Sequence, residues 1–274
     1  MPFPRVNRQH IGYFDIVKQQ LENQGYEVNG INISSLNRNH TWDLQRLLKR
    51  NYNLAQIKNI QMKSIDRLRN ANALFKLVVP KKYKERFQSS EQEKQITFKE
   101  VYENSENPIF LYSAGQNDFF TYINAGPVEL LNAQTRDQLQ NIGYLVKKSV
   151  DNVEENWNFL HDLNPKVQIF SLSTYDSPLF HKIQTLINLQ ENLKEPKLNR
   201  QNNFLRVTNL YNKLLEERAQ KYDFVEYVDI TFLKNYCAPL DFHPNTKGNE
   251  LIAEAIMEKI EAKQEKDSSK RGQK

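Results

Sequence analysis

The hydrophobic and polar positions of the chain follow two alternating patterns. In some stretches apolar residues recur every three to four positions, and this spacing predicts amphipathic helices. The predicted helices lie near residues 11–21, 42–48, 135–162, 204–214 and 251–260. Between them, short runs rich in apolar residues are typical of buried strands. The predicted strands lie at residues 27–34, 108–115, 167–174 and 224–230.

Strands that alternate with helices predict a parallel sheet covered on both faces, as in an α/β fold. In such folds, ligands bind beyond the carboxyl ends of the strands. Residues at about 51–106 are polar and have a broken periodicity, and we interpret them as a helical insertion. We therefore expect one α/β domain over residues 1–263, followed by a charged, disordered tail over residues 264–274.

Composition narrows the classes of function. The 274 residues are 39% hydrophobic, and 38 Lys and Arg against 33 Asp and Glu give a net charge of +5. Basic and acidic runs are intermixed, so we expect no nucleic-acid partner, although the Lys-rich region 51–100 keeps that alternative open. A single cysteine, Cys237, excludes an intramolecular disulfide and a CxxC-type metal site. The oligomeric state is left open.

The sequence also bears on the location of the protein. No stretch reaches the roughly 18–20 apolar residues that a membrane span needs, and the N-terminus does not resemble a secretion signal. We therefore expect a soluble, cytoplasmic chain. If a signal preceded residue 1, the protein would instead be secreted or on the cell surface.

His243 is the first candidate for chemistry. Pro244 fixes the backbone after it, and Asn245 and Thr246 can cap the helix predicted next. A histidine on a short rigid loop is well placed to act as a general base, and Asp241 could fix the tautomer of its ring. The alternative is a structural or surface histidine, which is the more common role for a lone histidine.

The second candidate is Asn117, which comes after the strand predicted at 108–115. An asparagine amide at a strand end can donate a hydrogen bond to a developing oxyanion, which contributes roughly 3 kcal/mol. Gly115 would allow close approach of the backbone, and Asp118 could accept hydrogen bonds from loop amides. The alternative is that Asn117 simply forms a turn.

Two serines and the cysteine complete the candidates. Ser34 and Ser35 could each donate a backbone N–H to the same oxyanion, or in principle act as a nucleophile. A serine pair in a turn is more often structural. A nucleophilic Cys237 would need the same base as a serine, and a small buried thiol is the favoured interpretation. No Gly-rich phosphate loop and no HExxH motif occurs in the chain.

These motifs, in this order, resemble the SGNH/GDSL hydrolases, a family of serine esterases and lipase-like acyl hydrolases. Residues 115–118 match the family's Gly-x-Asn-Asp block. His243 and Pro244, with Asn245 and Gly248 after them, match its His-Pro block, and residues 248–256 match its closing helix. The resemblance covers nearly the whole chain.

The resemblance implies a three-layer flavodoxin-like fold and hydrolysis of a small-molecule ester or acylated substrate without a metal or organic cofactor. By the resemblance, Asn117 would donate to the oxyanion and His243 would be the general base. Ser34 or Ser35 occupies the place of the family's oxyanion-hole glycine. Which ester or acyl group is the substrate is not indicated.

The chain departs from the family at two points. Leu240 stands where the family has its acid, and Asp241 comes one residue later. The Gly-Asp-Ser block with the nucleophile does not occur in the 274 residues, and residues 3–21 resemble the family's segment just after that block. We therefore expect a hydrolase that lacks the first, central strand of its sheet because it is truncated at its N-terminus. The alternative is a catalytically silent ligand-binding module with the same fold.

Overall fold

The computed structural model describes residues 12–28, 30, 49–71, 88–113, 136–175, 203–237 and 244–271. The chain divides into two compact units. Unit 1 comprises residues 1–31, 172–202 and 228–274, and unit 2 comprises residues 32–171 and 203–227.

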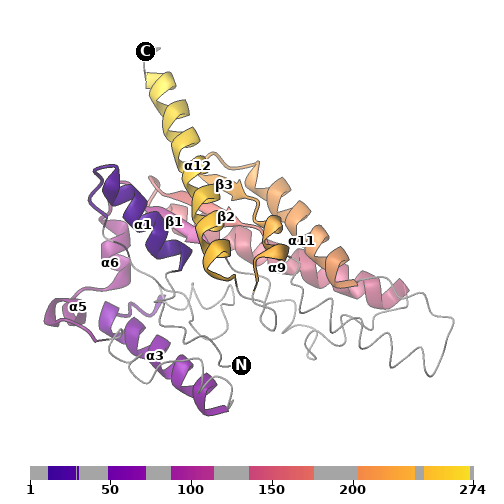
Figure 1. Cartoon of the computed structure of the whole chain (residues 1–274), viewed down its shortest axis with the longest axis horizontal. Coiled ribbons are helices and arrows are strands. Elements are labelled where there is room, and N and C mark those ends of the chain that lie inside the picture. The colour runs from indigo at the N-terminus through magenta and orange to yellow at the C-terminus, as the bar shows by residue number, and fades with distance from the viewer. Residues whose placement is uncertain are drawn as a thin grey trace, which may run out of the picture. The chain divides into compact units, whose positions relative to one another are not determined.

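The described strands form one small parallel sheet (Figure 1). They are β1 (Ile109–Tyr112), β2 (Gln168–Leu172) and β3 (Val225–Val228), in the spatial order β1-β2-β3. β1 and β2 pair in parallel, with Ile109 opposite Gln168 and Tyr112 opposite Ser171. These three strands were predicted at 108–115, 167–174 and 224–230. The described part of the chain is therefore a mixed α/β structure with an open three-stranded parallel sheet.

Helix α9 (Arg136–Leu163) belongs to unit 2. The residues that recur along its apolar stripe are almost completely buried, namely Val146, Val150, Val153, Trp157 and Leu160. Asn156 Nδ2 donates a hydrogen bond to Tyr112 Oη over 2.8 Å, which fixes α9 to β1. The long helix predicted at 135–162 is confirmed.

Helix α11 (Asn203–Ala219) lies beside α9 in unit 2 (Figure 1). The Arg218 guanidinium bridges the two helices, because it lies 2.9 Å from Asp151 Oδ1 and 2.8 Å from Glu154 Oε2. Tyr222 Oη donates to the other oxygen of Glu154 over 2.8 Å. This network fixes the end of α11 just before the chain enters β3.

The described part of residues 51–106 forms α3 (Leu54–Ala71), α5 (Glu91–Gln95) and α6 (Phe98–Glu103). Each helix is preceded by an N-cap residue, which exchanges two hydrogen bonds with the residue three positions later. The pairs are Asn53 with Gln56, Ser90 with Glu93, and Thr97 with Glu100. Such reciprocal caps satisfy backbone donors that a short helix cannot satisfy internally, which explains how so polar a segment forms helices.

Lys58→Met should raise the pKa of Glu93 toward that of an ordinary carboxyl group. Lys58 Nζ lies 2.6 Å from Glu93 Oε1, and its hydrogen bond is the main reason that the Glu93 pKa is lowered, with the Ser90 N–H as a further cause. A lowered pKa in the folded state stabilises the fold above the ordinary carboxyl range, and this is lost as the pH falls through the folded pKa.

The Lys58 variant should therefore be less stable by about 0.5 kcal/mol at neutral pH, and the difference should vanish in acid. NMR titration of the Glu93 carboxyl group measures the change in its pKa, and urea unfolding at neutral and at acidic pH measures the change in stability. Lys99→Met is the control, because Lys99 and Glu103 form a looser ion pair at 3.5 Å. A Glu93 pKa that does not move in Lys58→Met would contradict the assignment.

Unit 1 contains α1 (Tyr13–Asn23) packed against α12 (Thr246–Arg271) (Figure 1). Val17 and Leu21 of α1 are buried, and Gly25, with a φ of +90°, ends the helix in a conformation that favours glycine. The helix predicted near 11–21 is thus present. The strand predicted at 27–34 is not seen at residues 27, 28 and 30, which lie outside any strand, and its other residues lie outside the described part of the chain.

Helix α12 continues to Arg271, so residues 264–271 are helical where the sequence indicated disorder. Glu, Ala, Lys and Gln are good helix formers, and extending an existing helix needs no new nucleation. This helix is rich in charged side chains. No helix in the described part of the chain is both long and apolar enough to cross a membrane.

Candidate functional site

The candidate residues from the sequence lie outside the described residues. They are Asn117, His243 and Asp241, together with Ser34, Ser35, Gly115 and Asp118. The structure does describe how the chain reaches and leaves two of these segments. β1 ends at Tyr112, directly before the segment with Asn117, and Cys237 and Pro244 flank the segment with His243.

Polar side chains mark the carboxyl ends of β2 and β3, within unit 1. Ser173, just after β2, is only 2% exposed, and its Oγ accepts a hydrogen bond of 2.8 Å from the N–H of Ile230. The same hydroxyl lies 3.4 Å from Asp229 Oδ1, which also accepts the N–H of Thr231 over 2.9 Å. Asp229 itself is exposed to solvent. The end of β2 is therefore tied to the turn after β3.

From this turn a short 3-10 helix, η2 (Thr231–Asn235), leads toward the His243 segment. Leu233 is completely buried and anchors the helix in unit 1. Its carbonyl oxygen accepts the N–H of Tyr236 over 2.8 Å and the thiol of Cys237 over 3.3 Å. The Cys237 thiol is thus used in a local hydrogen bond at the end of η2.

Backbone pairing brings together the two ends of the segment 238–243. Cys237 and Pro244 form an antiparallel bridge, and the N–H of Asn245 donates to the Tyr236 carbonyl over 2.7 Å. We call Tyr236, Cys237, Pro244 and Asn245 the loop base. Pro244, which directly follows His243 in the sequence, is therefore held in place by backbone pairing at the loop base.

Helix α12 begins directly at the loop base. Asn245 Oδ1 accepts the N–H of Gly248 over 2.9 Å, so the cap predicted from the sequence at Asn245 is confirmed. Asn249 Nδ2 donates to the Asn245 carbonyl over 3.1 Å, and Asn249 Oδ1 accepts the N–H of Tyr13 over 3.3 Å. These bonds join the loop base to α12 and α1 of unit 1.

Gly248 is needed where α12 touches the loop base. A Cβ atom at this position would lie 2.9 Å from the Tyr236 carbonyl oxygen and 3.0 Å from Pro244 Cβ. The first distance is too short for a side-chain carbon, and the second is tighter than most contacts of a Cβ atom. Steric crowding therefore explains why position 248 is a glycine, and the sequence motif alone did not give this explanation.

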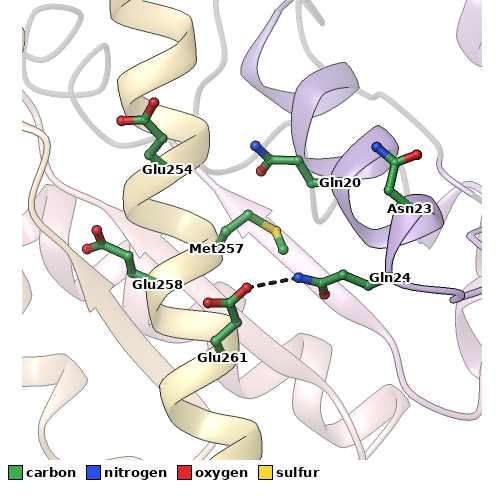
Figure 2. Close-up of a pocket in the computed structure, with 7 residues that line it drawn as sticks. All are labelled: Gln20, Asn23, Gln24, Glu254, Met257, Glu258 and Glu261. Atoms are coloured by element: carbon green, nitrogen blue, oxygen red, sulfur yellow. Dashed lines mark hydrogen bonds between the residues drawn. The ribbon is translucent and has the colours of Figure 1, made fainter.

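A separate groove of about 490 Å³ lies between α1 and α12 of unit 1. Figure 2 shows the residues that line it, which are Gln20, Asn23, Gln24, Glu254, Met257, Glu258 and Glu261. Gln24 Nε2 donates to Glu261 Oε1 across the groove over 2.9 Å. The lining offers carboxylates and amides but no histidine, serine or cysteine, so it does not contain the hydroxyl or thiol nucleophile and histidine base that the sequence motifs imply.

Sequence reasoning did not select Ser173 or Asp229. The available signal was a polar residue at the carboxyl end of two predicted buried strands, in the runs 167–174 and 224–230. No group of three or more His, Cys, Asp and Glu residues suited to a metal occurs in the part of the chain that the structure describes. The described residues at the ends of β2 and β3 therefore form a hydrogen-bonded network without a metal cluster among them.

The sequence matches no model of a known protein family and no curated protein.

Proposed function

We propose that the chain has an SGNH-type, flavodoxin-like fold and acts as a hydrolase on ester or acyl bonds. The observation that supports this proposal is the parallel order β1-β2-β3. Neighbouring parallel strands end at the same edge of a sheet. In the sequence, the motif with Asn117 follows β1, and the segment with His243 follows β3 and η2. Ligands of open α/β sheets bind beyond the carboxyl ends of the strands.

In the proposed reaction, His243 takes a proton from a nucleophilic hydroxyl as its oxygen attacks the acyl carbon. The carbonyl oxygen becomes an oxyanion, which the amide of Asn117 and a backbone N–H of Ser34 or Ser35 stabilise. His243 then protonates the leaving alcohol, and water releases the acyl group by the same steps in reverse order. Asp241 would accept the ring N–H of His243 and fix its tautomer.

The loop base supports the role of His243. A general base must hold its ring within hydrogen-bond distance of the nucleophile, and a loop with unfixed ends loses that geometry. Here the Cys237–Pro244 bridge and the Asn245 cap hold both ends of the segment. The same support would also serve a second candidate function, in which the protein binds a ligand without catalysis. The lack of a Gly-Asp-Ser sequence in the 274 residues favours this alternative.

A hydrolysis assay tests the proposal. A chromogenic short-chain ester is offered to two forms of the protein. One is the 274-residue chain, and the other also contains any residues encoded in frame before Met1. We expect activity in a form that contains the nucleophile. In that form His243→Ala should lower kcat by about 10²–10⁴-fold, and Asn117→Ala by about 10²–10³-fold.

His161→Ala is the matched control, because His161 stacks on Phe224 in unit 2 and has no part in the proposed reaction. Its kcat should stay within about twofold, since it touches no reacting group. Equal activity in the parent protein and in His243→Ala would refute the role of His243. Binding of the ester without turnover in every form would favour the silent module.

A further inference from the structure

Trp157 in α9 and Tyr222, which follows α11, form an edge-to-face ring pair within unit 2. Their ring centroids are 6.3 Å apart and their planes are inclined by 78°, a geometry that aromatic rings favour. Trp157 is completely buried, whereas Tyr222 is partly exposed. Indole and phenol rings are readily oxidised by one electron. The pair therefore connects the core of unit 2 to its surface through two oxidisable rings in contact.

The two rings differ in whether a base lies next to their acidic proton. Tyr222 Oη donates to Glu154 Oε1 over 2.8 Å, and it accepts from Asn158 Nδ2 over 3.3 Å. A phenol that loses an electron also loses its proton, so Tyr222 is easier to oxidise with an acceptor in place. Trp157 Nε1 is buried and has no hydrogen-bond partner. Oxidised Trp157 therefore keeps its proton and stays a radical cation, which is a stronger oxidant than the neutral indole radical.

Arg218 holds the proton acceptor in position. Its Nη1 lies 2.8 Å from Glu154 Oε2, and its Nη2 lies 2.9 Å from Asp151 Oδ1. The ion pair leaves Oε1, the other oxygen of Glu154, to accept the hydrogen bond from Tyr222. Glu154 is only 16% exposed, and a hydrogen bond to a carboxylate is stronger than one between neutral groups. The carboxylate is thus aligned with the phenolic proton before any oxidation occurs.

We propose that Trp157 and Tyr222 form an electron-transfer pair with Glu154 as the proton acceptor. A soluble one-electron oxidant takes an electron from Trp157 and leaves the radical cation. Tyr222 then gives an electron to Trp157 and its phenolic proton to Glu154 Oε1, which yields neutral Trp157, a Tyr222 phenoxyl radical and a protonated Glu154. A soluble thiol returns a hydrogen atom to the phenoxyl oxygen, and Glu154 releases its proton to water. This activity, which moves oxidation from the core to a ring that reductants reach, does not depend on the proposed hydrolase function.

Laser photolysis of the full chain tests the proposal. The parent for all variants is Trp42→Phe, which leaves Trp157 as the only tryptophan. An ultraviolet pulse that tyrosine does not absorb ejects an electron from Trp157, hexaamminecobalt(III) in solution takes it up, and transient absorption gives the lifetime of the indole radical cation. Tyr222→Phe keeps the ring and removes the phenolic proton, so this lifetime should lengthen about tenfold or more. Glu154→Gln removes the base and should lengthen it as well.

Tyr144→Phe is the matched control on the same helix. Tyr144 is 66% exposed and lies about 20 Å from Trp157 along α9, too far for contact between the rings. Its loss should leave the lifetime of the Trp157 radical unchanged. A lengthening in Tyr144→Phe equal to that in Tyr222→Phe would show that any tyrosine serves, and it would overturn the pairing.

Deuterium oxide provides a measurement that needs no fragile variant. In the parent, the radical of Trp157 should live longer in deuterium oxide than in water, because Tyr222 then transfers a deuteron. The difference should vanish in Tyr222→Phe and shrink in Glu154→Gln. Equal lifetimes in the parent and in Tyr222→Phe, or no solvent isotope effect in the parent, would overturn the proposal. An isotope effect of full size in Glu154→Gln would overturn the role of Glu154.

Discussion

Asn164→Asp should lower the free energy of unfolding by about 3 kcal/mol or more, because it replaces a buried donor by a buried acceptor. Asn164 is 4% exposed and begins the turn after α9, in which its carbonyl accepts the N–H of Val167 over 3.1 Å. Its Nδ2 donates to the carbonyls of Tyr102 and Ser105, each over 2.9 Å, and its Oδ1 accepts the N–H of Lys166 over 3.1 Å. The aspartate would have the same shape but would direct a carboxylate oxygen at two carbonyl oxygens.

Urea unfolding monitored by tryptophan fluorescence measures this loss. Asn104→Asp is the matched control, because Asn104 is exposed and its Nδ2 donates to a single carbonyl, that of Glu100, over 2.8 Å. The free energy of unfolding of the control variant should fall by about 1 kcal/mol or less, since water can solvate the new carboxylate. Similar losses in the two variants would mean that the contacts of Asn164 do not hold α6 to the turn before β2.

The sequence predicted the elements whose signal is local and strong. The apolar stripe over 135–162 places a helix within one residue of the observed α9 (Arg136–Leu163), because each buried position recurs on the same face. The runs 108–115, 167–174 and 224–230 each contain an observed strand, since a run of apolar residues bounded by polar ones is typical of a buried parallel strand. These features depend only on neighbours in the chain.

The links that support the candidate site are not local, and the sequence did not indicate them. Ser173 and Ile230 are 57 positions apart, and no spacing rule connects a serine at a strand end with a distant backbone N–H. The cap at Asn245 was predictable because it involves a residue only three positions away. The bridge between Cys237 and Pro244 depends on how η2 turns the chain, which periodicity does not encode.

The tail shows how composition can mislead. Residues 264–271 are all polar, which favours disorder when no apolar face is available for packing. They nevertheless continue α12, whose preceding turns bury Ile252, Ile256 and Ile260. A packed helix supplies the nucleus that an isolated polar segment lacks, and each further residue then adds a hydrogen bond at little cost. The side chain of Ser269 adds one more, to the Glu265 carbonyl over 2.9 Å.

Gly248→Ala should destabilise unit 1 by about 1–3 kcal/mol, although alanine is the better helix former. The added Cβ would lie 2.9 Å from the Tyr236 carbonyl oxygen, 3.0 Å from Pro244 Cβ and 3.2 Å from Tyr236 Cβ. A backbone oxygen cannot turn aside as a flexible side chain can. α12 must therefore move away from the loop base, which lengthens the 2.7 Å bond from Asn245 N–H to the Tyr236 carbonyl.

Gly143→Ala makes the same chemical change where space is available, in the body of α9. The nearest atom to its added Cβ is Leu210 Cδ2, at an ordinary 4.0 Å. This variant should be more stable than the parent by about 0.5–1 kcal/mol, because alanine loses less backbone entropy on folding. Thermal unfolding should thus move in opposite directions for the two variants. Stabilisation by both alanines would show that α12 does not touch the Tyr236 carbonyl, and the support proposed for His243 would lose its closest contact.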